Sequence, residues 1–218
     1  MNTFPGAITI EQCSEQLVLL PGRAIYQPRT STLIVGDVHL GKISHFRRSG
    51  IALPHEAALQ DIQRLSQLMA LTAAERCLIL GDLFHSSFNN EWRLLEDWRR
   101  EHAQAEVVLV QGNHDILPRE VYIALGIQVA IELREGPFVF RHRPDIAASD
   151  SVYLLCGHIH PAVRLTGTAR AEVKLPCFFF GARLGILPAF GEFTGTATMN
   201  AGRGDRVFVI AGDEVVEV

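Results

Sequence analysis

Polar side chains suited to metal binding follow several apolar runs of this chain. In chain order the motifs are Gly36-Asp37-Val38-His39, Gly81-Asp82, Gly112-Asn113-His114-Asp115, the single His142 and Gly157-His158-Ile159-His160. Imidazole, carboxylate and amide groups in such a combination favour manganese, iron, zinc or a similar transition metal over calcium or magnesium. These side chains are too many for one tetrahedral ion, so the pattern predicts two ions.

The candidate ligands divide into two groups that share one carboxylate. We expect one ion to bind Asp37, His39, Asp82 and His160, and the other to bind Asp82, Asn113, His142 and His158. Asp37 and His39 flank Val38, so on an extended backbone both would point to the same side. His142 is included because the second ion needs it, although an isolated histidine at a strand end could also be a surface residue.

Two divalent ions held by only two carboxylates leave excess positive charge, so an anion such as a phosphate is expected there. A metal-bridging hydroxide is available near neutral pH, because metal binding can lower the pKa of water to about 7. The expected reaction is in-line attack of this hydroxide on a phosphodiester. His114 is the predicted general acid, and Asp115 is expected to orient or polarise its ring.

Composition describes a globular chain. Hydrophobic residues make up 48% and charged residues 20% of the 218 residues, which argues against disorder and predicts a single domain over residues 1–218. The N-terminus lacks the pattern of a signal peptide, so a cytoplasmic protein is expected. Scattered single cysteines predict neither a zinc finger nor disulfides. The net charge of −4 gives no overall attraction for nucleic acid and leaves room for a local basic groove.

Short apolar runs alternate with helical periodicity, which indicates layered α/β structure. The runs at 32–35, 77–80, 107–110, 138–140 and 152–156 predict buried strands. Helices are expected from Pro54 with Ala58, Ile62, Leu65 and Met69 on one face, from Glu91 with Trp92 and Trp98 on another, and from Pro118 to Leu125.

The C-terminal part predicts a second, mainly antiparallel sheet. Its strands are expected at 178–180, 207–210 and 215–218, and a hairpin at 17–26, turning at Pro21-Gly22, could join it. The aromatic run Phe178 to Phe180 is interpreted as core. Two packed sheets flanked by helices result.

The order of the motifs resembles that of the calcineurin-like metallophosphoesterases. This resemblance implies an α/β fold of four layers, in which two mixed β-sheets pack as a sandwich flanked by helices. The chain departs from the broader family at His85, where a GDxxD pattern would place an acid, so His85 is interpreted as a residue near the leaving group.

Further segments are similar to the bacterial DNA-ligase-associated metallophosphoesterases. They include Leu20 to Ala24, Asp37 to Lys42, Phe46 to Gly50, Gly81 to Ser86, His158 to Pro161 and Leu187 to Gly191. The resemblance implies a manganese-dependent phosphodiesterase, with iron or zinc as other possible metals, acting as a DNA endonuclease in DNA repair. It also implies functional association with a DNA ligase, a helicase-like protein and an exonuclease-like protein.

Substrate specificity is open at this point. Lys42, Arg47 and Arg48 could bind nucleic-acid phosphates, with His85 near them, although a solvated basic turn fits the three cations equally well. A nucleotide phosphatase or pyrophosphatase would use the same ions and the same His114. A scaffold that binds partners without catalysis is expected to lack several of these residues, and here all are present.

Overall fold

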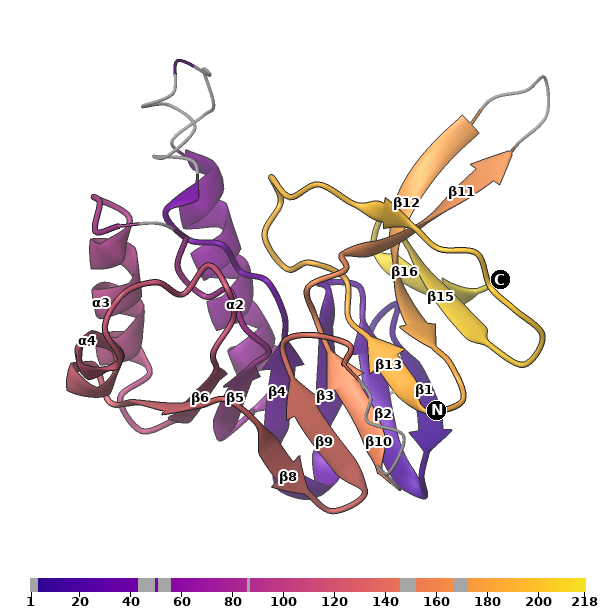
Figure 1. Ribbon diagram of the computed structural model, residues 1–218, viewed down its shortest axis with the longest axis horizontal. Coiled ribbons are helices and arrows are strands. Elements are labelled where there is room, and N and C mark those ends of the chain that lie inside the picture. Colours follow the sequence, from indigo (N-terminus) through magenta and orange to yellow (C-terminus); the bar gives the residue numbers. More distant parts are fainter. Residues whose placement is uncertain (1–3, 43–49, 51–55, 86, 146–151, 167–171) are drawn as a thin grey trace.

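The computed structural model describes residues 4–42, 50, 56–85, 87–145, 152–166 and 172–218, and their strands form two sheets (Figure 1). The first sheet has seven strands in sequence order. They are β1 (Ile8–Gln12), β2 (Glu15–Leu20), β3 (Ala24–Gln27), β4 (Thr32–Val35), β5 (Arg76–Ile79), β6 (Glu106–Val110) and β7 (Ile127–Ala130).

The first sheet changes character at β4. Strands β1 to β4 pair antiparallel, whereas β4, β5, β6 and β7 pair parallel. The carboxyl ends of parallel strands meet at one edge of a sheet, so the segments that follow β4, β5 and β6 emerge side by side.

The predicted hairpin at 17–26 exists, but its expected place in the second sheet is wrong. Its strands β2 and β3 lie in the first sheet, where β3 pairs with β4. Only the short 3₁₀ helix Pro28–Thr30 separates β3 from β4. So short a connection favours pairing with the next strand in sequence over crossing to another sheet.

The second sheet is mixed, with nine strands. They are β8 (Leu133–Glu135), β9 (Phe138–Arg141), β10 (Tyr153–Cys156), β11 (Pro161–Thr166), β12 (Glu172–Phe180), β13 (Leu184–Ile186), β14 (Ala197–Thr198), β15 (Arg206–Ala211) and β16 (Glu214–Glu217). Strand β10 pairs parallel with both β9 and β13, whereas β12, β15 and β16 pair antiparallel. Together with the helices, the two mixed sheets confirm the predicted fold class.

Neighbouring side chains along a strand point to opposite faces of the sheet, and this divides the hydrophobic core into layers. Leu33 and Val35 face the helices, while Ile34 between them faces the second sheet. The inter-sheet layer includes Phe178 and Phe180, and Phe179 belongs to a cluster on the other face of the second sheet. All three are buried, which confirms the interpretation of this aromatic run as core.

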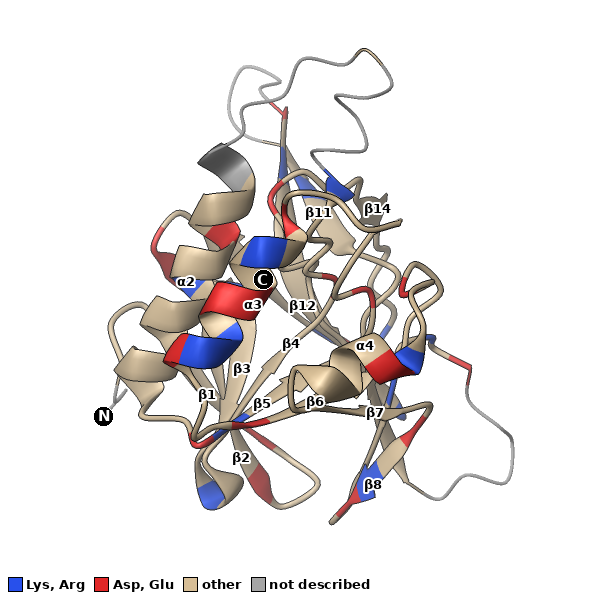
Figure 2. Ribbon diagram, turned by 90° about the vertical axis from the view of Figure 1, so that its left-hand side faces the viewer, with Lys and Arg blue, Asp and Glu red and all other residues tan. Residues whose placement is uncertain are grey.

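The described helices pack against the first sheet (Figure 2). They are α2 (Glu56–Thr72), α3 (Trp92–Glu101) and α4 (Arg119–Ala124). The expected apolar face of α2 is buried, as are both tryptophans of α3; the predicted start of α2 at Pro54 lies outside the described residues. Within the described ranges, no helix is long and apolar enough to cross a membrane.

Candidate metal centre

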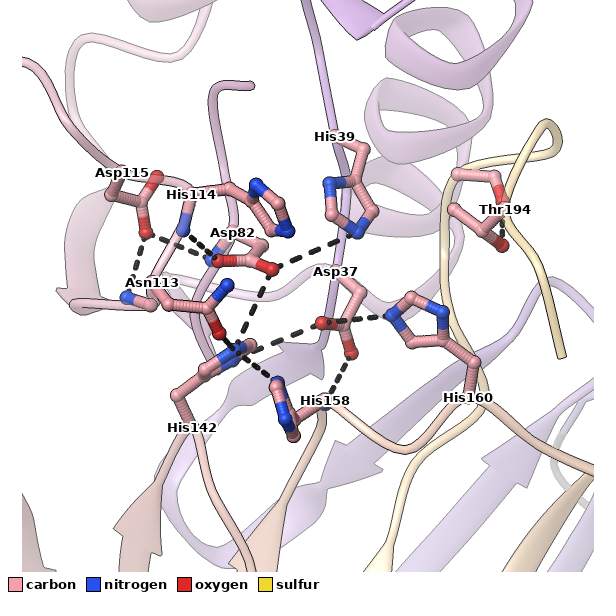
Figure 3. Close-up of polar contacts among 12 residues, drawn as sticks. Asp37, His39, Asp82, Asn113, His114, Asp115, His142, His158, His160 and Thr194 are labelled. Atoms are coloured by element: carbon pink, nitrogen blue, oxygen red, sulfur yellow. Dashed lines mark hydrogen bonds and ion pairs between the residues drawn. The ribbon is translucent and has the colours of Figure 1, made fainter. Parts of the chain in front are cut away.

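The segments that leave β4, β5, β6, β9 and β10 meet at one end of the two sheets (Figure 3). Each strand delivers polar side chains there. They are Asp37 and His39 after β4, Asp82 after β5, Asn113 and His114 after β6, His142 after β9, and His158 and His160 after β10. The structure therefore brings together every residue that the sequence predicts as a ligand.

The backbone at five of these residues is left-handed, and because Asp37 and His39 are among them, the expected extended conformation around Val38 is wrong. Asp37 has a φ of 56° and His39 a φ of 54°, and Asp82, His158 and His160 also have positive φ. Such conformations are unfavourable for residues other than glycine, and they cluster at functional sites. Both side chains still turn towards the centre (Figure 3).

Glycines next to the ligands make room for ligands of other motifs. A Cβ at Gly112 would lie 2.2 Å from Asp82 Oδ1, and a Cβ at Gly157 would lie 2.3 Å from Asp37 Oδ2. Both separations are below any real contact, so a larger residue would displace the carboxylate. The close approach of these carboxylates therefore explains why glycine precedes Asn113 and His158 in the two motifs.

The first ligand group consists of Asp37, His39 and His160, whose ligand atoms lie within 4.8 Å of one another. His160 Nδ1 donates to the Gly195 carbonyl at 2.9 Å, which leaves its Nε2 lone pair facing Asp37 Oδ1 at 3.2 Å. Burial opposes protonation of His160, but the negative charge of the nearby Asp37 raises its pKa.

His39 presents a neutral ring to the same group. Burial, with the positive charges around it, lowers the pKa of its imidazole strongly. Among the described residues, neither ring nitrogen of His39 has a hydrogen-bond partner, although the ring is buried. A buried nitrogen without a partner is costly, and a neutral imidazole is the form that binds a metal.

The second group is centred on His142, together with Asp37 and Asp82. His142 Nδ1 donates to the Leu80 carbonyl at 3.0 Å, so its Nε2 carries the lone pair. Asn113 Oδ1 lies 3.1 Å and Asp82 Oδ2 3.5 Å from this nitrogen. His158 Nδ1 lies 3.0 Å from it as well, and burial lowers the pKa of His158.

Both carboxylates lie between the two groups. Asp82 Oδ2 is 3.7 Å from His39 Nε2 and 3.5 Å from His142 Nε2. Asp37 Oδ1 is 3.2 Å from His160 Nε2 and 3.8 Å from His142 Nδ1. Asp82 therefore has the position expected of a shared ligand, whereas Asp37 approaches His142 at the nitrogen that donates to Leu80.

This arrangement fits bound cations. Around both groups, lone pairs on oxygen and nitrogen face one another, and Asp37 Oδ1 and His160 Nε2 are buried without a hydrogen bond from the described residues. Metal-bound histidines usually donate their other N–H to a carbonyl or carboxylate, as His142 and His160 do here.

His114 lies beside the candidate ligands, with its ring stacked on His85 at a centroid distance of 4.3 Å and an angle of 28°. Its ring centroid is 5.5 Å from that of His39. Its backbone N–H donates to Asp82 Oδ1 at 2.8 Å, which ties the β6 loop to the β5 loop. This placement agrees with a role for both histidines at the substrate.

Asp115 does not play the part expected of it, since its carboxylate is committed to backbone amides. Oδ2 accepts from Asp82 and Gly112, both at 2.8 Å, and Oδ1 accepts from Phe84 at 3.0 Å. Burial raises the pKa of Asp115 to about 6, although these amides favour the ionised form. Asp115 therefore holds the β5 and β6 loops together, and the prediction that it orients the His114 ring is corrected.

Lys42 is the predicted substrate-binding cation that the structure describes near the centre. It lines a small cavity with His39, and burial lowers its pKa against the attraction of Asp82 and Asp37. Arg47 and Arg48 lie outside the described residues.

Sequence reasoning missed one set of residues that support the centre. Asp61 and Arg64 of α2 contact the segment after β13, which carries the Gly195 carbonyl. The available signal was a charged residue, Asp61, next to the apolar stripe of α2. That signal does not predict which residues Asp61 and Arg64 contact, because these contacts join positions more than a hundred residues apart in the sequence.

The chain is similar to a known protein family and to several solved structures. A family model for calcineurin-like phosphoesterases matches residues 30–170. The nuclease MPE of Pseudomonas putida is 32% identical over 96% of this chain and 100% of its own, with a TM-score of 0.83. No curated protein sequence matches this chain.

Two further solved structures are more distant. A protein of unknown function from Aquifex aeolicus is 16% identical over 59% of this chain and 78% of its own, with a TM-score of 0.42. YfcE, a phosphoesterase from E. coli, is 14% identical over 86% of this chain and 97% of its own, with a TM-score of 0.45.

Proposed function

Because the chain belongs to the calcineurin-like phosphoesterase family, it is a metal-dependent phosphoesterase, and we propose that it hydrolyses phosphodiester bonds in DNA with two bound metal ions. The observation that carries the proposal is the convergence of ligand atoms in two groups, the first of which has buried lone pairs without a hydrogen-bond partner among the described residues. Cations between its members would stabilise such a set, because a buried polar atom without a partner is costly.

The proposed ligand groups keep Asp82 as the shared carboxylate. Asp37, His39 and His160 complete one group, and Asn113, His142 and His158 complete the other. Two divalent ions supply Lewis acidity, which neutralises phosphate charge and makes water acidic enough to act as a nucleophile near neutral pH. The resemblance to the DNA-ligase-associated family supports manganese as the native metal.

His114 is the proposed proton donor to the leaving oxygen. Its backbone N–H is fixed by Asp82, while its ring lies outside the ligand groups against His85. The stacked His85 ring limits how far the His114 ring can turn. General acid catalysis of this kind is typically worth about 10² to 10⁴ in rate.

The choice of DNA rests on the likeness to a nuclease over nearly the whole of both chains. Lys42 adds a positive charge beside the centre and is proposed to bind a substrate phosphate. The motif resemblance further supports endonucleolytic cleavage during DNA repair, alongside a DNA ligase, a helicase-like protein and an exonuclease-like protein.

The test is manganese-dependent hydrolysis of an aryl phosphodiester, an aryl phosphomonoester and circular single-stranded DNA by the wild type and His114→Ala. We expect cleavage of the diester and the circle by the wild type, and a loss of about 10² to 10⁴ in turnover in the variant with both ions retained. His102→Ala is the matched control, since His102 bonds Ser66 on the helices away from the centre.

Two results would change the assignment. Hydrolysis of the monoester alone would identify a nucleotide phosphatase. Unchanged turnover in His114→Ala would remove this residue from the mechanism.

A further inference from the structure

The segment Ala189 to Gly195, here called the 189–195 loop, lies against the backbone of the first ligand group. It follows β13, whose parallel pairing with β10 brings its carboxyl end to the metal centre. Phe190 N donates to the Gly36 carbonyl at 2.8 Å, and Gly191 N donates to the Asp37 carbonyl at 3.0 Å. The approach is so close that a Cβ on Gly191 would lie 2.5 Å from the carbonyl oxygen of Val38.

The far end of this loop orients His160. The Gly195 carbonyl accepts the Nδ1–H of His160 at 2.9 Å, so its position decides where Nε2 points. Thr194 Oγ1 donates to the Gly191 carbonyl at 3.0 Å and closes the loop on itself. The loop therefore supports the backbone of Asp37 and the ring of His160 at once.

Helix α2 holds the loop from the other side. Asp61, which is 5% exposed, accepts from Arg64 at 2.7 Å and from the backbone N–H of Glu192 at 3.3 Å. Arg64 donates to the Phe190 carbonyl, and its guanidinium lies 4.4 Å from the centroid of the Phe190 ring. Glu192 in turn pairs with Arg23 at 3.0 Å.

The chemistry of this pair favours a geometric role over a purely stabilising one. A buried ion pair adds little net stability, because desolvation of both charges offsets their attraction. The pair instead supplies directed hydrogen bonds, and these reach the backbone of the loop at Phe190 and Glu192. Arg64 Nη2 makes both bonds, and the planar guanidinium fixes the directions of its N–H groups, whereas an ammonium group rotates freely.

We propose that Asp61 and Arg64 are positioning residues for one ion only, the ion bound by Asp37, His39 and His160. The inference rests on the proposed two-metal centre. The ligand His142, which belongs to the other group alone, has a different support, since the Leu80 carbonyl orients its ring. Loss of the α2 contacts should therefore weaken one metal site and spare the other.

The experiment titrates manganese into the metal-free full-length protein by calorimetry and follows the coupling of the two ions by electron paramagnetic resonance. The wild type is expected to bind two ions per chain. In Asp61→Asn and Arg64→Ala, one ion should bind as in the wild type and the other about 10- to 100-fold more weakly. At a manganese concentration that fills only the stronger site, the resonance signal of a spin-coupled pair of ions should then be absent. Arg64→Lys is the milder variant if Arg64→Ala does not fold.

A matched control separates positioning from stability. Arg76 forms a comparably buried pair with Glu135 at 2.7 Å, at the start of β5 and away from the metal centre. Arg76→Ala should lose stability and keep both ions at wild-type affinity. The identity of the weakened site is checked by adding His158→Ala to Asp61→Asn, which should weaken both ions.

Two outcomes would overturn the inference while leaving the metal centre intact. One is wild-type affinity for both ions in Asp61→Asn and Arg64→Ala, and the other is equal weakening in Arg76→Ala. A wild type that binds no manganese would instead overturn the proposed function itself, so the two failures are distinguishable.

Discussion

At the scale of single residues, Asp115 holds the β5 and β6 loops through three backbone amides. In Asp115→Asn, one carboxylate oxygen is replaced by an NH2 group, which cannot accept a hydrogen bond. At least one buried backbone N–H therefore loses its partner. An unsatisfied buried donor costs about 1–3 kcal/mol. We expect Asp115→Asn to lower the free energy of unfolding by about that amount, measured by urea denaturation of the metal-free protein.

The outcome distinguishes the two interpretations of Asp115. A residue that acted only on the His114 ring would lower turnover in the variant and leave the unfolding curve unchanged. That result would contradict the role in loop support.

Gly157 gives a second prediction at this scale. A Cβ in Gly157→Ala would overlap Asp37 Oδ2, so the carboxylate must move away from the ligand position. Metal affinity should fall by at least about 10-fold, measured by manganese titration. Gly36→Ala is the control, because its Cβ would meet its nearest neighbour at an ordinary 3.5 Å. Equal losses in both variants would contradict the argument from close contact.

The convergence of the candidate ligands could be predicted because each follows a buried strand within a few positions. A polar residue placed there must lie at the strand end, and parallel strands bring such ends together. Asp61 and Arg64 could not be predicted, since their partners in the 189–195 loop are set by tertiary packing alone. The role of Asp115 was missed for the same reason.

At the scale of elements, the layer between the sheets depends on large side chains such as Phe178. This residue of β12 is fully buried against the first sheet. Truncation to alanine leaves a cavity, and we expect Phe178→Ala to lower the free energy of unfolding by about 3–5 kcal/mol. Val216→Ala on β16, where the side chain is 42% exposed, should change it by less than about 0.5 kcal/mol. Similar denaturation midpoints for the two variants would contradict this account.

The sequence predicts where the strands lie in the chain better than it predicts which strands pair with one another. Runs of apolar residues locate β4, β5, β6, β9 and β10 to within a residue or two, because burial on both faces removes polar residues from the strand. The same reasoning does not say which sheet a strand joins. The hairpin of β2 and β3 was misplaced because apolar alternation looks alike in either sheet.

At the scale of the whole molecule, metal removal should destabilise the protein. Without ions, Asp37 Oδ1 and ring nitrogens of His39 and His160 are buried without a hydrogen-bond partner among the described residues. One site at a free metal concentration of 100 times its dissociation constant adds about 2.7 kcal/mol, and a domain of this size shifts by roughly 2–4 °C per kcal/mol. We expect chelation to lower the melting temperature by about 5–10 °C per site lost. The shift should shrink in Asp82→Asn, and an unchanged melting temperature would contradict metal binding to the native state.

The ligands come from strand ends of both sheets and span residues 37 to 160. Contacts so distant in sequence are slow to form, so the centre is expected to assemble after most of the chain has folded. An interaction that is absent from the folding transition state stabilises the native state without speeding its formation. Manganese should therefore leave the folding rate nearly unchanged and slow unfolding, so that the ions determine how long a folded molecule lasts rather than how quickly it appears.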